Sequence, residues 1–408
     1  MGLTFAAQIV GMGLTVVNAA IIARWLGPDG KGAYTLATLM PFMLALFLSG
    51  GVGLANVYFA GSRRIDVARL TANTLAYALM ATAAAVLIVA ALIFTGALAR
   101  WMPGVPTQVV ILASFWLPLS LLNTLLLNIL QGLHRIKEVN FANLTQGSVT
   151  LMTTGVCVIL LGWGLVGAII ATWLGTVAAL TMAVRYLRRE GASFRPRWDA
   201  AVLRPTIAYG LRGHIGSIFQ FLNYRLDTFI VGGFLGVSGV GFYGSAVSLG
   251  ELLWQFPNAV GFVIFPKSSA SRPEEMNRFT PRVLKITLGI LILGAALLAL
   301  AGPFLIELIY GPAFAPSYPP LLALLPGVVL MGGGKVLTNE IAGRGYLQYN
   351  SVCAGLSLVL TVILDLTLIP RFGATGAAVA SSLAYSAYFA AALGFYLHVS
   401  RRRPEVVP

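Results

Sequence analysis

The sequence predicts an all-α polytopic membrane protein with about 12 transmembrane helices in two six-helix lobes. Three observations predict this fold class: the composition, the number of long apolar segments, and an internal repeat. Of the 408 residues, 58% are hydrophobic and only 10% are charged, whereas a soluble domain carries about a quarter charged residues. So little charge cannot cover a water-exposed surface, and lipid must therefore be the solvent for most of the chain.

Apolar segments long enough for the ~20 residues of one membrane crossing follow one another along the whole sequence. They lie at residues 2–25, 33–60, 71–98, 107–131, 140–161, 165–187, 205–235, 242–265, 283–303, 317–341, 350–369 and 375–398. The run from Val139 to Val184 carries no charge and is too long for one helix. Gly162 and Gly164 mark the expected break, because glycine commonly ends a helix.

Lysine and arginine residues gather in one set of loops, which holds 20 of the 27. The opposite loops hold only Arg24, Lys31, Arg100 and Arg371. Because cytoplasmic loops of membrane proteins are enriched in Lys and Arg, we expect the first set and both termini to be cytoplasmic. The same bias explains the net charge of +14. We expect no nucleic-acid partner, because the sequence shows no basic soluble module.

Short motifs recur at a nearly constant offset of about 209 residues. Leu26–Tyr34 recurs as Leu235–Tyr243, with the leucine, three glycines and the tyrosine matching. The other recurrences are Gly164–Ala168 as Gly373–Ala377, Pro118 as Pro326, and Gly132 as Gly343. The matches predict two halves of the same topology, related by an axis along the membrane normal.

The repeat sets the expected domain organisation. We expect an N-terminal six-helix lobe at 1–190, a cytoplasmic inter-lobe linker at 191–204, a C-terminal six-helix lobe at 205–400 and a basic cytoplasmic tail at 401–408. Two-lobed membrane proteins of this kind commonly rock one lobe against the other around a site near the middle of the bilayer.

Ionisable residues interrupt the apolar segments of the second half alone. They are Arg212, Arg225, Asp227, Glu251, Lys335, Glu340 and Asp365. At the repeat offset, Asp227 aligns with Asn18 and Asp365 with Val156. An ionisable group near the bilayer centre costs at least roughly 2.5–3.5 kcal/mol, so charges confined to one half favour a working site there. The alternative is a set of structural ion pairs.

Three of these residues, Asp227, Glu251 and Asp365, are candidates for ion coupling. Asp227 and Glu251 should lie ~13–15 Å below the turn at Gly236, close to the middle of the bilayer. If the two carboxylates face each other, one should hold its proton, which would suit proton coupling. Alternatively, each is neutralised separately, for instance by Arg212 or Arg225.

Cationic residues supply the candidate substrate-binding site. His214 and Arg225 are eleven residues apart and share a helix face; with Arg212 and Lys335 they could line a cationic cavity. Arg24 either extends outward to the membrane surface or points at an anion in the lumen. The sequence offers no nucleophile–base pair, no zinc-ligand spacing and no cofactor fingerprint in a fitting context. We therefore predict no catalytic residues, no metal, no cofactor and no enzyme activity.

The stretch Ala23–Tyr34 resembles the first-loop signature of polysaccharide-biosynthesis membrane proteins. These are the oligosaccharide flippases of the multidrug/oligosaccharidyl-lipid/polysaccharide exporter superfamily. Arg225–Asp227 followed by Leu235–Tyr243 resembles the seventh-helix region of that family, and Gly373–Ala378 resembles its last turn.

The resemblance implies a flippase that moves undecaprenyl-diphosphate-linked glycan units across the bacterial cytoplasmic membrane by alternating access. It implies a cationic central cavity, to which Arg24 and Arg225 would contribute. A proton or a sodium ion would be the coupling ion. Membrane lipids and proteins of polysaccharide assembly are the expected partners, and cell-surface polysaccharide biosynthesis is the expected process.

Two other functions compete with this one. A cation-coupled multidrug extruder of the same superfamily would use the acidic groups Asp227, Glu251 and Asp365. A membrane glycosyltransferase or ligase that uses the same lipid carrier would need a sizeable outer loop for its catalytic residues, and every predicted outer loop is short.

Overall fold

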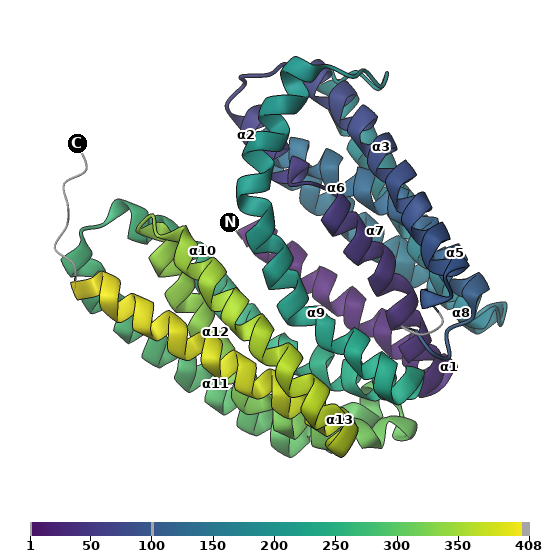
Figure 1. The fold of residues 1–408 in the computed structure, drawn as a ribbon, viewed down its shortest axis with the longest axis vertical. Helices are drawn as coiled ribbons and strands as arrows, with labels where there is room; N and C mark the ends of the chain where they lie inside the picture. The colour runs from purple at the N-terminus through teal and green to yellow at the C-terminus, as the bar shows by residue number, and fades with distance from the viewer. Residues whose placement is uncertain (1, 99–101, 402–408) are drawn as a thin grey trace. The chain divides into compact units, whose positions relative to one another are not determined.

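The computed structural model describes residues 2–98 and 102–401, except for the side chains of residues 2–6 and of Arg212 (Figure 1). Within these ranges every regular element is helical. The first elements are α1 (Gly2–Leu48), α2 (Val52–Gly61), α3 (Val67–Phe94), α5 (Thr107–Ser114), α6 (Trp116–Gly132), α7 (Ile136–Thr154), a π-helical turn (Gly155–Leu160) and α8 (Gly164–Arg189). They are followed by α9 (Ala200–Glu251), α10 (Gln255–Ala270), α11 (Pro273–Tyr310), α12 (Tyr318–Gly343) and α13 (Leu347–Arg401).

Eight segments of the described chain are long and apolar enough to cross a membrane. Three of them are far longer than the ~20 residues of one crossing: Ala7–Leu48, Gly213–Ala270 and Leu347–Arg401. Each of these reverses direction at a glycine and counts as two crossings. Together with α7 and its π-helical turn, the described residues provide about 12 crossings, which confirms the predicted fold class.

The reversals occur where α1, α9 and α13 lose helical backbone angles at a single glycine. Gly27 has φ 68° and ψ −174°, Gly236 has φ 66° and ψ −166°, and Gly373 has φ 59° and ψ −141°. Residues with a Cβ atom strongly disfavour these angles. Contacts across the glycines show that two of these helices fold back: the Tyr243 hydroxyl reaches Asp227 in α9, and the Ser357 hydroxyl reaches the Ala384 carbonyl in α13.

The chain forms two compact units, Met1–Ile218 and Phe219–Pro408. The boundary falls inside α9, whose first part belongs to unit 1 and whose second part belongs to unit 2. In unit 1, α7 packs on α8 and α1, and α6 packs on α2 and α8. In unit 2, α12 packs on α10, α11 and α13; Figure 1 shows these four helices running alongside one another.

The internal repeat extends to close helix packing. A Cβ added at Gly132 of α6 would lie 2.5 Å from the Val57 carbonyl oxygen of α2 and 2.8 Å from the Ala60 side chain. At Gly343 of α12, a Cβ would lie 2.6 Å from the Phe265 carbonyl oxygen of α10. Both glycines therefore allow two helix backbones to touch at equivalent places in the two units. This close packing explains why glycine occurs at both positions of the internal repeat.

The segment that was predicted as the inter-lobe linker, residues 191–204, belongs to unit 1 and is held against α3. The Arg197 N–H donates to the Ala72 carbonyl at 3.1 Å, and the Asp199 N–H donates to Asn73 Oδ1 at 3.1 Å. Asp199 also pairs with Arg69 at 2.6 Å. The Arg69 guanidinium holds the pKa of this carboxyl, which lies outside the membrane-spanning segments, below its ordinary value.

Candidate functional site in the second unit

Arg225 forms a bidentate ion pair with Glu251 across the fold of α9. The two guanidinium nitrogens lie 2.9 and 3.0 Å from the two carboxylate oxygens. The side chains are 35% and 22% exposed, so the pair is neither fully buried nor free in solvent. Glu251 therefore faces Arg225 rather than Asp227. This geometry corresponds to the second alternative of the sequence analysis, in which an arginine neutralises Glu251 separately from Asp227.

Lys335 of α12 lies over an aromatic floor. Its Nζ is 4.2 Å from the Trp254 ring centroid and 5.4 Å from that of Tyr224, both within the ~6 Å range of cation–π attraction. The Trp254 indole N–H donates to the Val328 carbonyl at 3.0 Å, which fixes the ring. Tyr385 contacts both other rings edge-on.

The polar partner of this ammonium group is an amide, since Lys335 Nζ donates to Asn258 Oδ1 at 3.1 Å. Among the described residues no carboxylate lies within ion-pair distance of Lys335, and its side chain is partly exposed. A cation held by neutral groups keeps its charge available for an anionic ligand. Arg225 differs, because Glu251 already occupies both arms of its guanidinium.

Asp227 is buried in a shell of hydroxyl groups. One carboxylate oxygen accepts the Tyr243 hydroxyl at 2.5 Å and the Ser381 hydroxyl at 3.3 Å. The other accepts the backbone N–H of Thr228 at 2.6 Å. Asp227 is 1% exposed. These groups come from both arms of α9 and from the second arm of α13.

Asp365, in the first arm of α13, is within electrostatic range of Asp227. It is fully buried, and neither of its oxygens has a hydrogen-bond partner among the described residues. Thr361, one helical turn earlier, has a buried hydroxyl that also lacks a partner there. Leaving buried polar atoms without partners is costly. An oxygen-rich site of this kind suits a proton or a hard cation.

Unit 1 contains the same scaffold without the carboxylates. Tyr34 contacts the Thr172 hydroxyl at 2.9 Å, and Tyr243 contacts the Ser381 hydroxyl at 3.0 Å, in each case at the repeat offset of 209. Asn18 takes the place of Asp227. The tyrosine–hydroxyl contact therefore belongs to the common architecture, whereas the acidic pair is particular to unit 2.

The remaining predicted substrate-binding residues lie elsewhere. Arg24 is exposed in unit 1, three residues before the Gly27 reversal. His214 is also in unit 1, where it is 5% exposed and its Nε2 donates to the Phe47 carbonyl at 3.3 Å. The side chain of Arg212 lies outside the described residues. The roles of all three stay predictions.

The sequence analysis missed the neutral residues of the site, namely Tyr224, Tyr243, Trp254, Asn258, Thr361 and Ser381. A signal existed for Tyr243: it follows Gly236 by seven residues, Asp227 precedes Gly236 by nine, and a reversal at Gly236 brings the two together. No comparable signal places Trp254 beneath Lys335.

About a dozen membrane crossings among the described residues, built from a repeat and with buried carboxylates in unit 2, define a multi-pass membrane protein. Sequence comparison then identifies the family. The family of polysaccharide biosynthesis proteins matches residues 21–319, and the chain belongs to it.

Relatives and solved structures agree with this class. The chain is 28% identical over 203 residues to the probable low-salt glycan biosynthesis flippase Agl15 of Haloferax volcanii, which covers 45% of this chain and 40% of that protein. It is 24% identical over 189 residues to the uncharacterized membrane protein MJ1068 of Methanocaldococcus jannaschii, which covers 45% of this chain and 37% of that protein. The chain thus spans less than half the length of either relative.

Two solved structures share the fold over nearly the whole chain. The lipid II flippase MurJ in an inward closed conformation has a TM-score of 0.78 at 15% identity, and covers 98% of this chain and 90% of its own. An inward-facing multidrug resistance MATE family transporter of the MOP superfamily has a TM-score of 0.73 at 16% identity, with coverage of 97% and 98%. The similar proteins with stated functions are flippases and transporters.

Proposed function

We propose that this protein is a flippase for lipid-linked oligosaccharides. It would move undecaprenyl-diphosphate-linked glycan units across the bacterial cytoplasmic membrane by alternating access. Family membership and the flippase relative support the reaction. The observation that carries the substrate class is the partly exposed cation of Lys335, held by Asn258 and aromatic rings rather than by a carboxylate. A diphosphate cannot cross ~30 Å of hydrocarbon without such a charge partner.

Lys335 and Arg225 differ in how freely each could contact the phosphate groups of a substrate. The family resemblance favoured Arg24 and Arg225, but the guanidinium of Arg225 is engaged by Glu251. Lys335 is now the stronger candidate for the phosphate contact in unit 2. Arg225 would act on substrate only if Glu251 released it.

Ion coupling is assigned to the buried acidic pair. Asp227 and Asp365 repel each other unless a proton or a cation lies between them, and the unpartnered oxygens of Asp365 would supply its ligands. Binding of an ion would then remove the penalty of two buried charges. A gradient of that ion would in this way bias unit 2 between two states.

A multidrug extruder is less well supported. Asp227 and Asp365 are 1% and 0% exposed, so neither is presented to a bulky cationic drug. The partly exposed carboxylate, Glu251, is already paired with Arg225. The ammonium group of Lys335 would repel such a drug.

The orientation follows from the basic loops, which would place both termini in the cytoplasm. Glycan would then leave from the side of the Gly27, Gly236 and Gly373 reversals. Proteins of polysaccharide assembly on that side would receive it.

Reconstitution tests the proposal. Purified protein is placed in liposomes with a fluorescent undecaprenyl-diphosphate oligosaccharide, and a membrane-impermeant glycosidase reports exposure on the outer leaflet. We expect Lys335→Gln to slow flipping about ten- to hundredfold, because a hydrogen bond to a charged group contributes ~1.5–3 kcal/mol. Lys285→Gln, which removes an exposed lysine of α11 outside the Lys335 cluster, should flip normally.

The measurement separates the competing functions. An unchanged glycan that changes leaflet indicates a flippase, whereas a change in its length indicates a transferase. Normal flipping by Lys335→Gln would remove this residue from the site. No flipping by the wild-type protein would overturn the proposed function.

A further inference from the structure

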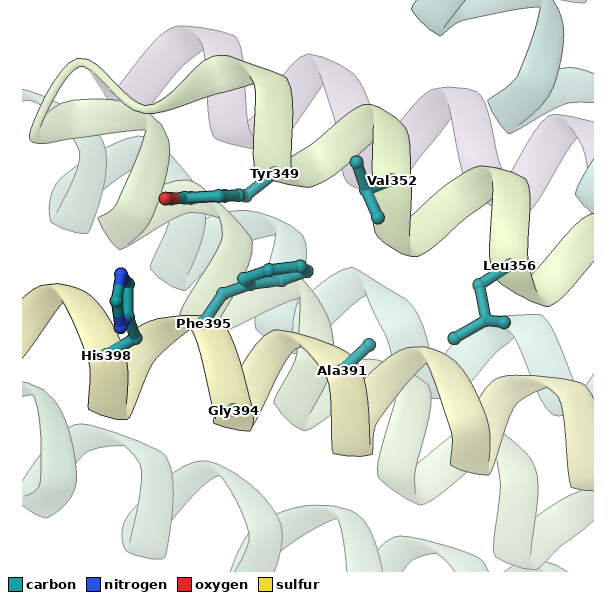
Figure 2. A pocket seen from close by; sticks show the side chains of 7 residues that line it. All are labelled: Tyr349, Val352, Leu356, Ala391, Gly394, Phe395 and His398. Carbon is teal, nitrogen blue, oxygen red and sulfur yellow. The ribbon is translucent and has the colours of Figure 1, made fainter.

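An open apolar groove runs along the outer side of α13, between its two antiparallel arms (Figure 2). Val352 and Leu356 form one wall, and the small residues Ala391 and Gly394 leave the opposite wall hollow. Its volume of 430 Å³ lies within the range of ligand sites. Val352 and Leu356 are 53% and 51% exposed, so nothing in the described chain covers this wall.

One end of the groove is polar and cationic. The Tyr349 and Phe395 rings stack at 4.4 Å and close the floor there, and His398 stands beside them, as Figure 2 shows. Arg401 follows one helical turn later and is exposed. The apolar surface thus ends beside an exposed arginine.

This combination of surfaces identifies the chemistry of the occupant. Within a membrane-spanning segment, an apolar hollow that no other part of the described chain covers is in contact with lipid hydrocarbon. Cations at the membrane surface attract anionic head groups. A ligand that satisfies both is a lipid whose chain lies against Val352 and Leu356 while its phosphate meets His398 and Arg401.

We infer that this groove is a binding site for an anionic phospholipid of the leaflet that faces the basic loops. The site is separate from the Lys335 and Asp227 clusters, since it lies on α13 residues that belong to neither. The inference therefore does not depend on the transported substrate.

Photo-crosslinking tests the site in the full-length protein. The probe is phosphatidylglycerol with a diazirine on one acyl chain, in detergent-purified protein, and mass spectrometry locates the adducts. We expect adducts on the peptides that contain Val352, Leu356 and Ala391. Phosphatidylcholine with the same chain should give fewer adducts there. Replacing Arg401 by glutamine should lower the phosphatidylglycerol signal about fivefold, towards the phosphatidylcholine level. Replacing His398 as well, which removes an imidazole hydrogen-bond donor, should lower it further.

Two glycines provide a matched pair of variants. A Cβ at Gly394 meets nothing within 4 Å, so Gly394→Leu should fold normally while it fills the groove. Gly355 is equally unobstructed but does not line the groove. We expect Gly394→Leu to abolish the adducts and Gly355→Leu to retain them.

Three results would overturn the inference. The first is equal labelling by phosphatidylglycerol and phosphatidylcholine. The second is labelling that survives in a well-folded Gly394→Leu protein. The third is displacement of the probe by undecaprenyl phosphate at much lower concentration than by unlabelled phosphatidylglycerol, which would make the occupant an isoprenoid.

Discussion

At the scale of single residues, Arg225 can serve the fold through Glu251 or serve the substrate. Arg225→Gln leaves the Glu251 carboxylate without its partner and should reduce the amount of protein in the membrane. The loss in the free energy of unfolding should stay below the ~3–5 kcal/mol that breaking a buried ion pair costs, because the side chains of Arg225 and Glu251 are 35% and 22% exposed. The double variant Arg225→Gln/Glu251→Gln removes both charges and should restore accumulation.

Flipping by the double variant then separates the two roles. Accumulation is measured by quantitative immunoblotting of membranes, and flipping by the liposome assay. If the pair is structural, the double variant accumulates and flips normally. If Arg225 contacts substrate during transport, the double variant accumulates but flips slowly. Failure of the double variant to accumulate would show that the charged pair itself is required for folding.

Asp365 is the second residue whose surroundings lead to a measurable prediction. An ion that binds the folded protein alone raises its thermal midpoint. If the ion is sodium, replacing potassium chloride by sodium chloride should raise the midpoint. If it is a proton, the midpoint should rise as the pH falls, because the native state then binds more protons than the unfolded state.

Asp365→Asn should remove whichever dependence the wild-type protein shows, because the variant loses the charge that binds the ion. Asp29→Asn, an exposed carboxyl in unit 1, should retain it. A wild-type midpoint that responds to neither sodium nor pH would rule out ion coupling at this pair.

At the scale of elements, the glycine reversals can be tested without disturbing any side-chain contact. Gly236 has φ 66° and ψ −166°, and a Cβ there meets nothing within 4 Å. Any cost of Gly236→Ala therefore comes from the backbone and should be about 1–3 kcal/mol. Gly233, one turn earlier in the same helix, is equally unobstructed and has no positive φ.

Gly233→Ala should be neutral or stabilising, because alanine favours a helix over glycine by about 1 kcal/mol. The comparison uses the thermal midpoint of each purified variant. A loss of stability in Gly233→Ala equal to that in Gly236→Ala would contradict the assigned reversal. Gly27→Ala in unit 1 should behave like Gly236→Ala, since the two glycines share one conformation.

At the scale of the whole molecule, apolar segment lengths and the repeat were enough to predict the helical fold. Because lipid offers no hydrogen-bond partners, the backbone N–H and C=O groups of a spanning segment must bond to each other, as they do in a helix. The length and composition of a segment therefore predict a transmembrane helix. Gly27 and Gly236 revealed the repeat because the backbone angles of the reversal strongly favour glycine. Gly132 and Gly343 match for a different reason, because a side chain at either position would separate two helix backbones that touch.

The site was harder to predict because its geometry depends on which helix faces meet. The position of Asp227 relative to Tyr243 follows from counting residues across one reversal. Lys335 and Trp254 are 81 residues apart in the sequence. They meet because α12 packs on α10 and on the 3-10 turn Leu252–Trp254 that precedes it. A single sequence does not show which helix faces pack together. For the same reason, the sequence could not decide whether Glu251 faces Arg225 or Asp227.

The membrane orientation is the largest feature that stays a prediction, and cysteine labelling can decide it. Cys157 and Cys353 are both buried, so they should contribute little background labelling to intact cells. Cysteines placed at Arg189 or Pro273 lie beside the basic loops and should react only with reagents that enter the cytoplasm. Cysteines at Asp29 or Thr375 lie beside the Gly27 and Gly373 reversals and should react with impermeant maleimide from outside. The physical reason is that Lys and Arg are retained on the cytoplasmic side during insertion. The opposite labelling pattern would falsify the orientation and would reverse the direction of transport that we propose.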